Sequence, residues 1–281
     1  MKVHISIDME GIAGIADAAD TTPGAPHFSY SRELMTGECN AAIEGCFDGG
    51  ATEVIVNDSH DGMLNLIPDR LDRRARIIRG RSKEYGMMQG IDEDTAATMF
   101  VGYHARAGNE AGGVLNHTMR GRDVLGVFLN DEPAGELRLN AALAGWHGVP
   151  VAVITGDDVL CAEGRACLGS VEAVEVKEAI DKYTALSLHP ELARDQIRDA
   201  ATRAVSKLED YEPYQITTPT TLRVSWNSTS IAALCESVPG VRRVGARDSE
   251  YTGSDYPEIY RLLRVLLALA GTTASSGYTY D

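Results

Sequence analysis

The chain has 281 residues, of which 44% are hydrophobic and 24% charged, and its formal net charge is −15. This composition is typical of a globular protein that buries a large core without disulfide or metal staples. The excess of acidic residues argues against nucleic acid and against an anionic membrane surface as partners.

The first predicted strand ends in two carboxylates. Val3, Ile5 and Ile7 alternate with polar residues, and Asp8 and Glu10 follow them. Residues i and i+2 of an extended chain point to the same side, so these two acids repel each other unless a cation lies between them. The alternative interpretation is an ordinary acidic turn in contact with solvent.

Two further predicted strands end in potential metal ligands. The strand over 53–57 stops at His60, and the apolar strand over 98–103 ends at His104. Taken alone, each histidine is more often an ordinary loop or sheet-end residue than a ligand. Because ligands gather at the carboxyl ends of strands in open α/β sheets, the coincidence favours a site.

The alternation of strand and helix predicts an α/β fold, with a mainly parallel sheet flanked by helices. After about residue 186 the pattern changes, so we predict an α/β domain over 1–186 and a smaller C-terminal α/β lobe over 187–281. The other expected helices are at 31–47, 83–89, 134–147, 190–208, 229–236 and 256–270, and the other expected strands at 75–78, 124–129, 149–154, 222–226 and 241–246.

The five cysteines and the chain ends bear on location. There is no C-x-x-C pair, which is typical of reduced thiols in a cytoplasmic protein. No long apolar run follows a basic start, so we expect no signal peptide. The apolar run 262–270 is interrupted by Arg264 and is too short to span a bilayer.

The candidate metal ligands are Asp8, Glu10, His60, His104 and Glu136. A mixed set of carboxylates and imidazoles suits zinc, with manganese or cobalt as alternatives. The set exceeds what one tetrahedral zinc needs and is enough for two ions that share a bridging carboxylate, for which Asp8 is the natural choice. Glu136 also has a simpler interpretation, as an acid favoured at a helix N-terminus.

Several other enzyme classes lack support. The sequence contains no H-E-x-x-H, G-x-S-x-G, Walker A or G-x-G-x-x-G motif. Another two-metal hydrolase, an amidohydrolase or a phosphoesterase, remains open, although a phosphoesterase needs a basic clamp and only Arg106 and Arg120 lie near the motifs. A catalytically inactive, metal-stabilised binding protein is the alternative outside the enzymes.

Five segments of the chain carry a further signal. They are Ser6-Ile7-Asp8-Met9-Glu10-Gly11-Ile12, Val56-Asn57-Asp58-Ser59-His60, Gly102-Tyr103-His104-Ala105-Arg106-Ala107, Asn116-His117-Thr118-Met119 and Asn130-Asp131-Glu132-Pro133-Ala134-Gly135-Glu136-Leu137. Together they resemble the bacterial zinc-dependent D-aminopeptidase family, of the type encoded with a dipeptide transport operon. The match is dense to about residue 160 and looser afterwards.

The resemblance implies a binuclear zinc aminopeptidase that acts on short peptides with an N-terminal D-residue, D-alanine above all, and a ring-shaped homo-oligomer. It implies that Asp8 bridges two ions, with Glu10 and His60 completing one site, and His104 and Glu136 the other. His117 would be the catalytic histidine and not a ligand. Two departures near His117, an insertion at 109–111 and Asn116 in place of an expected serine, bear on substrate preference.

Overall fold

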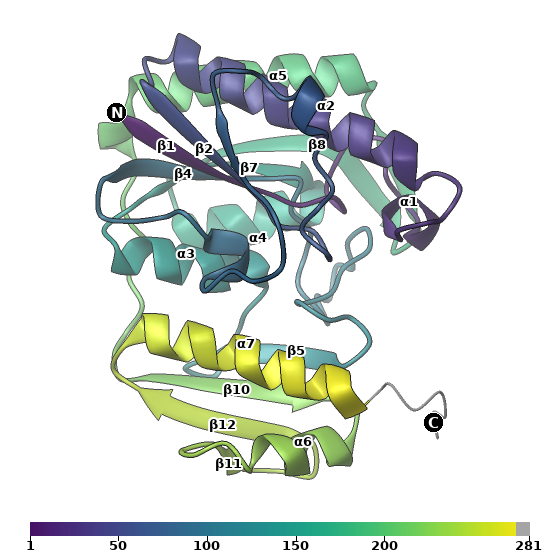
Figure 1. Cartoon of the computed structure of the whole chain (residues 1–281), viewed down its shortest axis with the longest axis vertical. Helices are drawn as coiled ribbons and strands as arrows, with labels where there is room; N and C mark the ends of the chain where they lie inside the picture. The colour runs from purple at the N-terminus through teal and green to yellow at the C-terminus, as the bar shows by residue number, and fades with distance from the viewer. Residues whose placement is uncertain (274–281) are drawn as a thin grey trace.

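Two β-sheets organise residues 1–273, the part of the chain that the computed structural model describes (Figure 1). Sheet A has the strand order β3-β2-β1-β4-β7-β8-β9 and is parallel except for its last strand, β9, which is antiparallel to β8. This confirms the predicted mainly parallel α/β fold. Its strands are β1 (Lys2–Ile7), β2 (Glu53–Asp58), β3 (Arg76–Ile78), β4 (Thr95–Val101), β7 (Val151–Asp157), β8 (Glu172–Asp181) and β9 (Thr184–Ser187).

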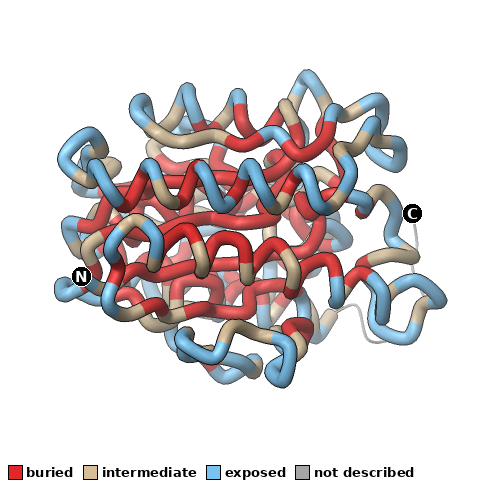
Figure 2. The backbone as a smooth tube through the Cα atoms, turned by 90° about the horizontal axis from the view of Figure 1, so that it is seen from above, coloured by how far each residue is buried: buried red, intermediate tan, exposed pale blue. Residues whose placement is uncertain are grey.

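Helices cover both faces of sheet A (Figure 1). On one face α2 (Phe28–Asp48) packs against α5 (Pro190–Ser206), and on the other lie α3 (Glu136–Trp146) and α4 (Asp158–Leu168). A Cβ at Gly45 of α2 would lie 2.4 Å from the carbonyl oxygen of Arg198, so only glycine allows these two helices to approach so closely. Figure 2, seen from above, shows the helices on the upper face with buried segments toward the sheet and exposed segments outward.

Sheet B is antiparallel and is covered by the last long helix. Its strand order is β11-β12-β10-β5-β6. Helix α7 (Tyr256–Thr273) contacts this sheet, α6 and α3, and therefore joins the two layers of the molecule. The elements of this part are β5 (Val124–Leu129), β6 (Glu132–Pro133), β10 (Thr220–Trp226), α6 (Thr229–Cys235), β11 (Arg242–Arg243) and β12 (Asp248–Gly253).

The structure corrects several predicted elements. The helix expected around 83–89 is only a single 3-10 turn, η2 (Gly86–Met88), and the strand expected at 241–246 is the two-residue β11. Helix α4 and strands β8, β9 and β12 were not predicted. The remaining short elements are α1 (Ala18–Thr21), η1 (Pro68–Arg70) and η3 (Leu208–Asp210).

The two sheets draw on residues from both predicted domains. Strands β5 and β6, from the first range, belong to sheet B, whereas α5, from the second range, packs on α2 above sheet A. The division into 1–186 and 187–281 as domains stays a prediction. Within the described residues, no helix combines the length and hydrophobicity needed to cross a membrane. The five cysteines are all free.

Candidate metal centre

Parallel pairing brings the ends of three strands to one edge of sheet A. Strand β1 lies between β2 and β4, with Ile7 in register with Asp58 on one side and Val101 on the other. The backbone N–H of Asp8 donates to the carbonyl of Val101 at 2.8 Å. The segments that follow these strands, with Asp8, His60 and His104, therefore leave the sheet side by side.

The tight turn after Glu10 depends on glycine. The N–H of Gly11 donates to the carbonyl of Gly102 at 2.8 Å. A Cβ at Gly11 would lie 1.9 Å from the carbonyl oxygen of Tyr103, so no larger residue fits. This contact presses the turn that carries the acidic pair against the segment that carries His104.

Glu136 reaches the same place from sheet B. The hairpin β5–β6 leads directly into α3, whose first residue is Glu136. Its Oε1 accepts the backbone N–H of Met119 at 2.6 Å, and the start of a helix favours a negative charge. Glu136 is only 3% exposed, so its carboxylate is part of this buried cluster.

A backbone carbonyl orients each of the three histidines. His104 and His117 donate through Nδ1 to the carbonyls of Ala105 at 3.0 Å and Leu115 at 2.8 Å. His60 donates through Nε2 to the carbonyl of Thr21 at 3.0 Å. The other ring nitrogen of each histidine is turned away from these carbonyls, and in the neutral imidazole it would carry the lone pair that a metal-ligating histidine needs.

These remaining nitrogens all face the carboxylates. Nδ1 of His60 lies 3.3 Å from Asp8 and 3.0 Å from Glu10. Nε2 of His104 lies 3.6 Å from Asp8 and 3.5 Å from Glu136. Nε2 of His117 lies 3.8 Å from Glu136.

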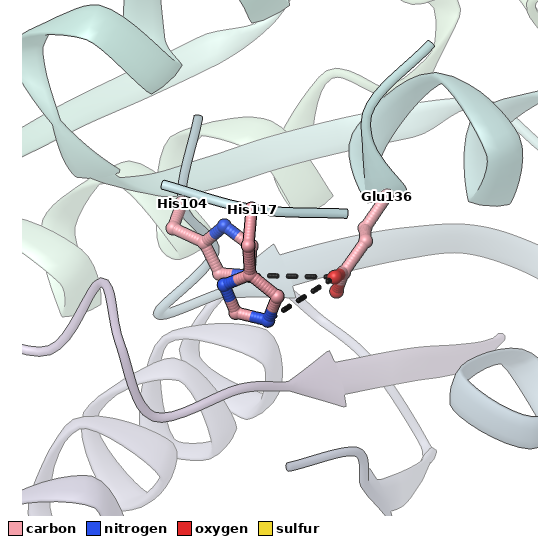
Figure 3. A group of neighbouring side chains, drawn as sticks. All are labelled: His104, His117 and Glu136. Atoms are coloured by element: carbon pink, nitrogen blue, oxygen red, sulfur yellow. Dashed lines mark ion pairs between the residues drawn. The ribbon is translucent and has the colours of Figure 1, made fainter. Parts of the chain in front are cut away.

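Figure 3 shows the rings of His104 and His117 side by side, both directed at the carboxylate of Glu136. Their planes are 13° apart and their centroids 4.1 Å apart.

The donor set fits divalent cations. Asp8, Glu10 and His104 offer ligand atoms within 4.8 Å of one another, and so do His104, His117 and Glu136. Within residues 1–273, Nε2 of His104 is one of few buried polar atoms without a hydrogen-bond partner. A buried imidazole nitrogen left unpaired between two carboxylates is what a metal-ligand position requires.

The electrostatics of the cluster point the same way. Burial, and then the neighbouring charge of Glu10, raises the pKa of Asp8 to about 7. Burial would lower the pKa of His104, but the charges of Glu136 and Asp8 outweigh it and raise that pKa to about 10. Without a metal the cluster thus retains protons, which a divalent cation would displace on binding.

The cluster lies in a cleft of about 910 Å³. The predicted ligands Asp8, Glu10, His60 and Glu136 line it together with His117, while His104 is 2% exposed at its base. The structure therefore brings all six predicted residues together. The division of these residues into five ligands and one catalytic histidine stays a prediction, because His117 is also within reach as a ligand.

Sequence reasoning missed the residues that support the cluster. Lys177 of β8 is buried and donates through Nζ to the carbonyls of Ile12 at 3.0 Å and Ile15 at 2.6 Å, and also to that of Glu10. Glu38 of α2 accepts the N–H of Ala13 at 2.8 Å. The alternation of β8 would have placed Lys177 on the face opposite to the buried Val174 and Val176, so no residue pattern signals its burial.

The β8–β9 hairpin and Asp157 were missed as well. Asp157 accepts the N–H of Val114 at 2.6 Å and caps α4 through the N–H of Leu160. The carbonyl of Lys182, in the turn between β8 and β9, accepts the N–H of Leu115 at 2.8 Å. These contacts fix the glycine-rich loop that precedes His117.

Comparison with known proteins gives matches along almost the whole chain. A sequence profile of the peptidase M55 family, described as D-aminopeptidase, matches residues 1–265. A D-aminopeptidase of Bacillus subtilis (strain 168) is 32% identical over 278 residues, which cover 98% of this chain and 99% of that protein.

A solved structure has the same fold. It is the zinc-dependent D-aminopeptidase DppA from Bacillus subtilis, described as a self-compartmentalizing protease. The TM-score is 0.94 at 31% sequence identity, and the alignment covers 99% of this chain and 100% of that one. Likeness of this extent includes both sheets and the helices between them.

Proposed function

Because the chain belongs to the D-aminopeptidase family, we propose that it is a binuclear zinc aminopeptidase. Its reaction is the hydrolysis of the N-terminal peptide bond of short peptides that begin with a D-amino acid, D-alanine above all. The observation that carries this proposal is the meeting of three buried carboxylates with three histidines, each of which turns one ring nitrogen toward those carboxylates. The resemblance supplies the preference for the D-configuration.

Two zinc ions would be held by five residues. Asp8 contacts both His60 and His104 and would be the shared ligand. Glu10 and His60 would complete one site, and His104 and Glu136 the other. Zinc bound there supplies Lewis-acid polarisation of the scissile carbonyl and activation of water.

His117 is placed to move protons. Its side chain is 22% exposed at the cleft, whereas that of His104 is 1% exposed. The carbonyl of Leu115 holds Nδ1, so Nε2 is the atom that accepts or donates a proton. The acidic cluster also gives the free N-terminal amine of a peptide a negative environment.

We further propose a closed, ring-shaped homo-oligomer in the cytoplasm. The relative DppA is described as self-compartmentalizing. The leucines of α7 offer no contact face, because Leu263, Leu266 and Leu267 are buried within the chain. The exposed apolar residues Ile180 and Leu186 of the β8–β9 hairpin offer a better contact surface. A monomer in light scattering at micromolar concentration would refute the assembly.

The function is tested by metal analysis together with a substrate panel. The zinc-reconstituted protein should contain two ions per chain and cleave D-alanyl p-nitroanilide and D-Ala-D-Ala faster than L-alanyl p-nitroanilide. Asp8→Asn should lose metal and activity. Asp61→Asn, which lies in the same cleft but outside the predicted ligand set, should keep its metal.

Each result has a defined meaning. Equal or faster cleavage of the L-substrate would refute the preference for D-residues and leave the proposed aminopeptidase activity standing. Turnover of a phosphodiester alone would overturn the reaction type. One ion or fewer per chain after reconstitution would overturn the binuclear centre.

A further inference from the structure

One wall of the cleft carries a pair of arginines that the proposed reaction does not use. Arg120 and Arg122 both line the cleft, as does Asp123 between them. Asp123 is 1% exposed and accepts from Nε of Arg120 at 2.7 Å and from Nε of Arg122 at 3.1 Å. One carboxylate thus compensates two guanidinium groups, which leaves a net positive charge on this wall.

The pair is fixed relative to the metal ligands. It belongs to the same loop as His117, and the loop is tied to Glu136 by the N–H of Met119 at 2.6 Å. The N–H of Asp123 donates to the carbonyl of Arg120 at 2.9 Å. A Cβ at Gly121 would lie 3.1 Å from Cβ of His117, so the arginine turn packs directly on the catalytic histidine.

Both arginine side chains keep exposed surface, and the guanidinium of Arg120 also lies near the end of α7, where a Cβ at Gly271 would be 3.2 Å from Nη2. The side chain of Arg120 is 38% exposed and that of Arg122 is 59% exposed. Their geometry suits a carboxylate, since a guanidinium offers two parallel N–H groups to its two oxygens. Two arginines on one loop stand out here, because the chain carries a net charge of −15 and the same cleft holds the acidic cluster.

We propose that Arg120 and Arg122 bind the C-terminal carboxylate of the peptide substrate. This inference rests on the proposed aminopeptidase function and narrows its substrate class to short peptides with a free C-terminus. The peptide would lie along the cleft with its amino end at the acidic cluster and its carboxylate at the arginine pair. A peptide whose C-terminus is amidated, or too far from its amino end to reach the arginines, would lose the contact with the arginine pair.

The test compares D-Ala-Gly and D-Ala-Gly-Gly with their C-terminal amides. A hydrogen-bonded charge pair of this kind is worth about tenfold to hundredfold. For the wild-type zinc enzyme we expect kcat/KM for the free acid to exceed that for the amide by this factor in at least one of the two pairs, mainly through KM.

Variants locate the contact. Arg122→Gln is the main one, because Asp123 keeps Arg120 as a partner. It should lower the acid-to-amide ratio at least severalfold, and Arg120→Gln with Arg122→Gln should bring the ratio close to one. Arg122→Lys, which keeps the charge but loses the fork, should be intermediate. Arg242→Gln is the matched control, an exposed arginine that pairs with Glu250 outside the cleft, and its ratio should stay at the wild-type value.

The outcomes distinguish a failure of the carboxylate site from a failure of the proposed aminopeptidase function. Equal rates for acid and amide in the wild type, in both pairs, would overturn the carboxylate site and leave the aminopeptidase intact. An Arg122→Gln variant that loses both rates in proportion would show a structural part for the arginine and also overturn the inference. Hydrolysis of neither substrate, with zinc bound, would overturn the proposed function and the inference together.

Discussion

Lys177 is the buried cation behind the turn that carries Glu10, and its removal should weaken both the fold and the metal centre. It is 3% exposed, and its ammonium group donates to three backbone carbonyls, those of Glu10, Ile12 and Ile15. Lys177→Met keeps most of the side-chain volume and removes the three donors. The perturbation therefore tests hydrogen bonding and charge more than packing.

The expected magnitude follows from these contacts. Each buried carbonyl left without a donor costs about 1–3 kcal/mol. Part of this is offset, because burial lowers the pKa of Lys177 to about 8 and the variant no longer pays for a buried charge. We expect a net loss of about 2–4 kcal/mol. For a chain of 281 residues, with an unfolding entropy of about 2 cal/mol/K per residue, this corresponds to a Tm lower by about 3–7 °C.

Calorimetry with and without chelator, together with zinc titration, measures both effects. Zinc affinity should fall about tenfold to hundredfold, because the turn that positions Glu10 loses its support. Lys207→Met, at an exposed lysine, is the control and should change neither quantity. A Lys177→Met protein with Tm within 1 °C of wild type and unchanged zinc affinity would refute this role of Lys177.

Three further predictions test other parts of the centre. Gly11→Ala should lose about 1–3 kcal/mol or more of stability in chemical denaturation, because its Cβ would meet the carbonyl of Tyr103. Gly62→Ala is the control and should change stability by less than about 0.5 kcal/mol, because the nearest neighbouring atom lies 4.0 Å from its Cβ. Similar stability of the two variants would contradict this prediction.

Burial raises the pKa of Glu38 from 4.5 to about 7. The folded protein therefore holds the proton of the Glu38 carboxyl group more tightly than the unfolded chain does. The resulting stability is present below about pH 4.5 and is lost as the pH rises through 7. Glu38→Gln should therefore gain about 3 kcal/mol relative to wild type between pH 4 and 8, and a pH-independent difference in urea unfolding would count against it. His117→Ala should lower kcat by about 10²–10⁴ and keep its zinc, whereas loss of zinc would make His117 a ligand.

The sequence by itself determined the elements with a strong period and the residues at their ends. The alternation in β1 and the apolar runs of β2 and β4 predicted three strands that end at Asp8, His60 and His104. Because parallel neighbours have their carboxyl ends at one edge, this local information was enough to predict that these residues lie together in a candidate metal site. The resemblance added His117 and the pairing of ligands.

Only the tertiary structure decided what surrounds these residues. Lys177 lies 167 positions from Glu10 in the chain, and Arg122 has the pattern of an ordinary surface residue until the cleft is formed. The backbone carbonyls that orient the three histidines cannot be predicted from residue types either, because every residue has a carbonyl group. Periodicity reports burial and direction along one element, whereas contacts between distant segments depend on how the elements pack, which no local pattern encodes.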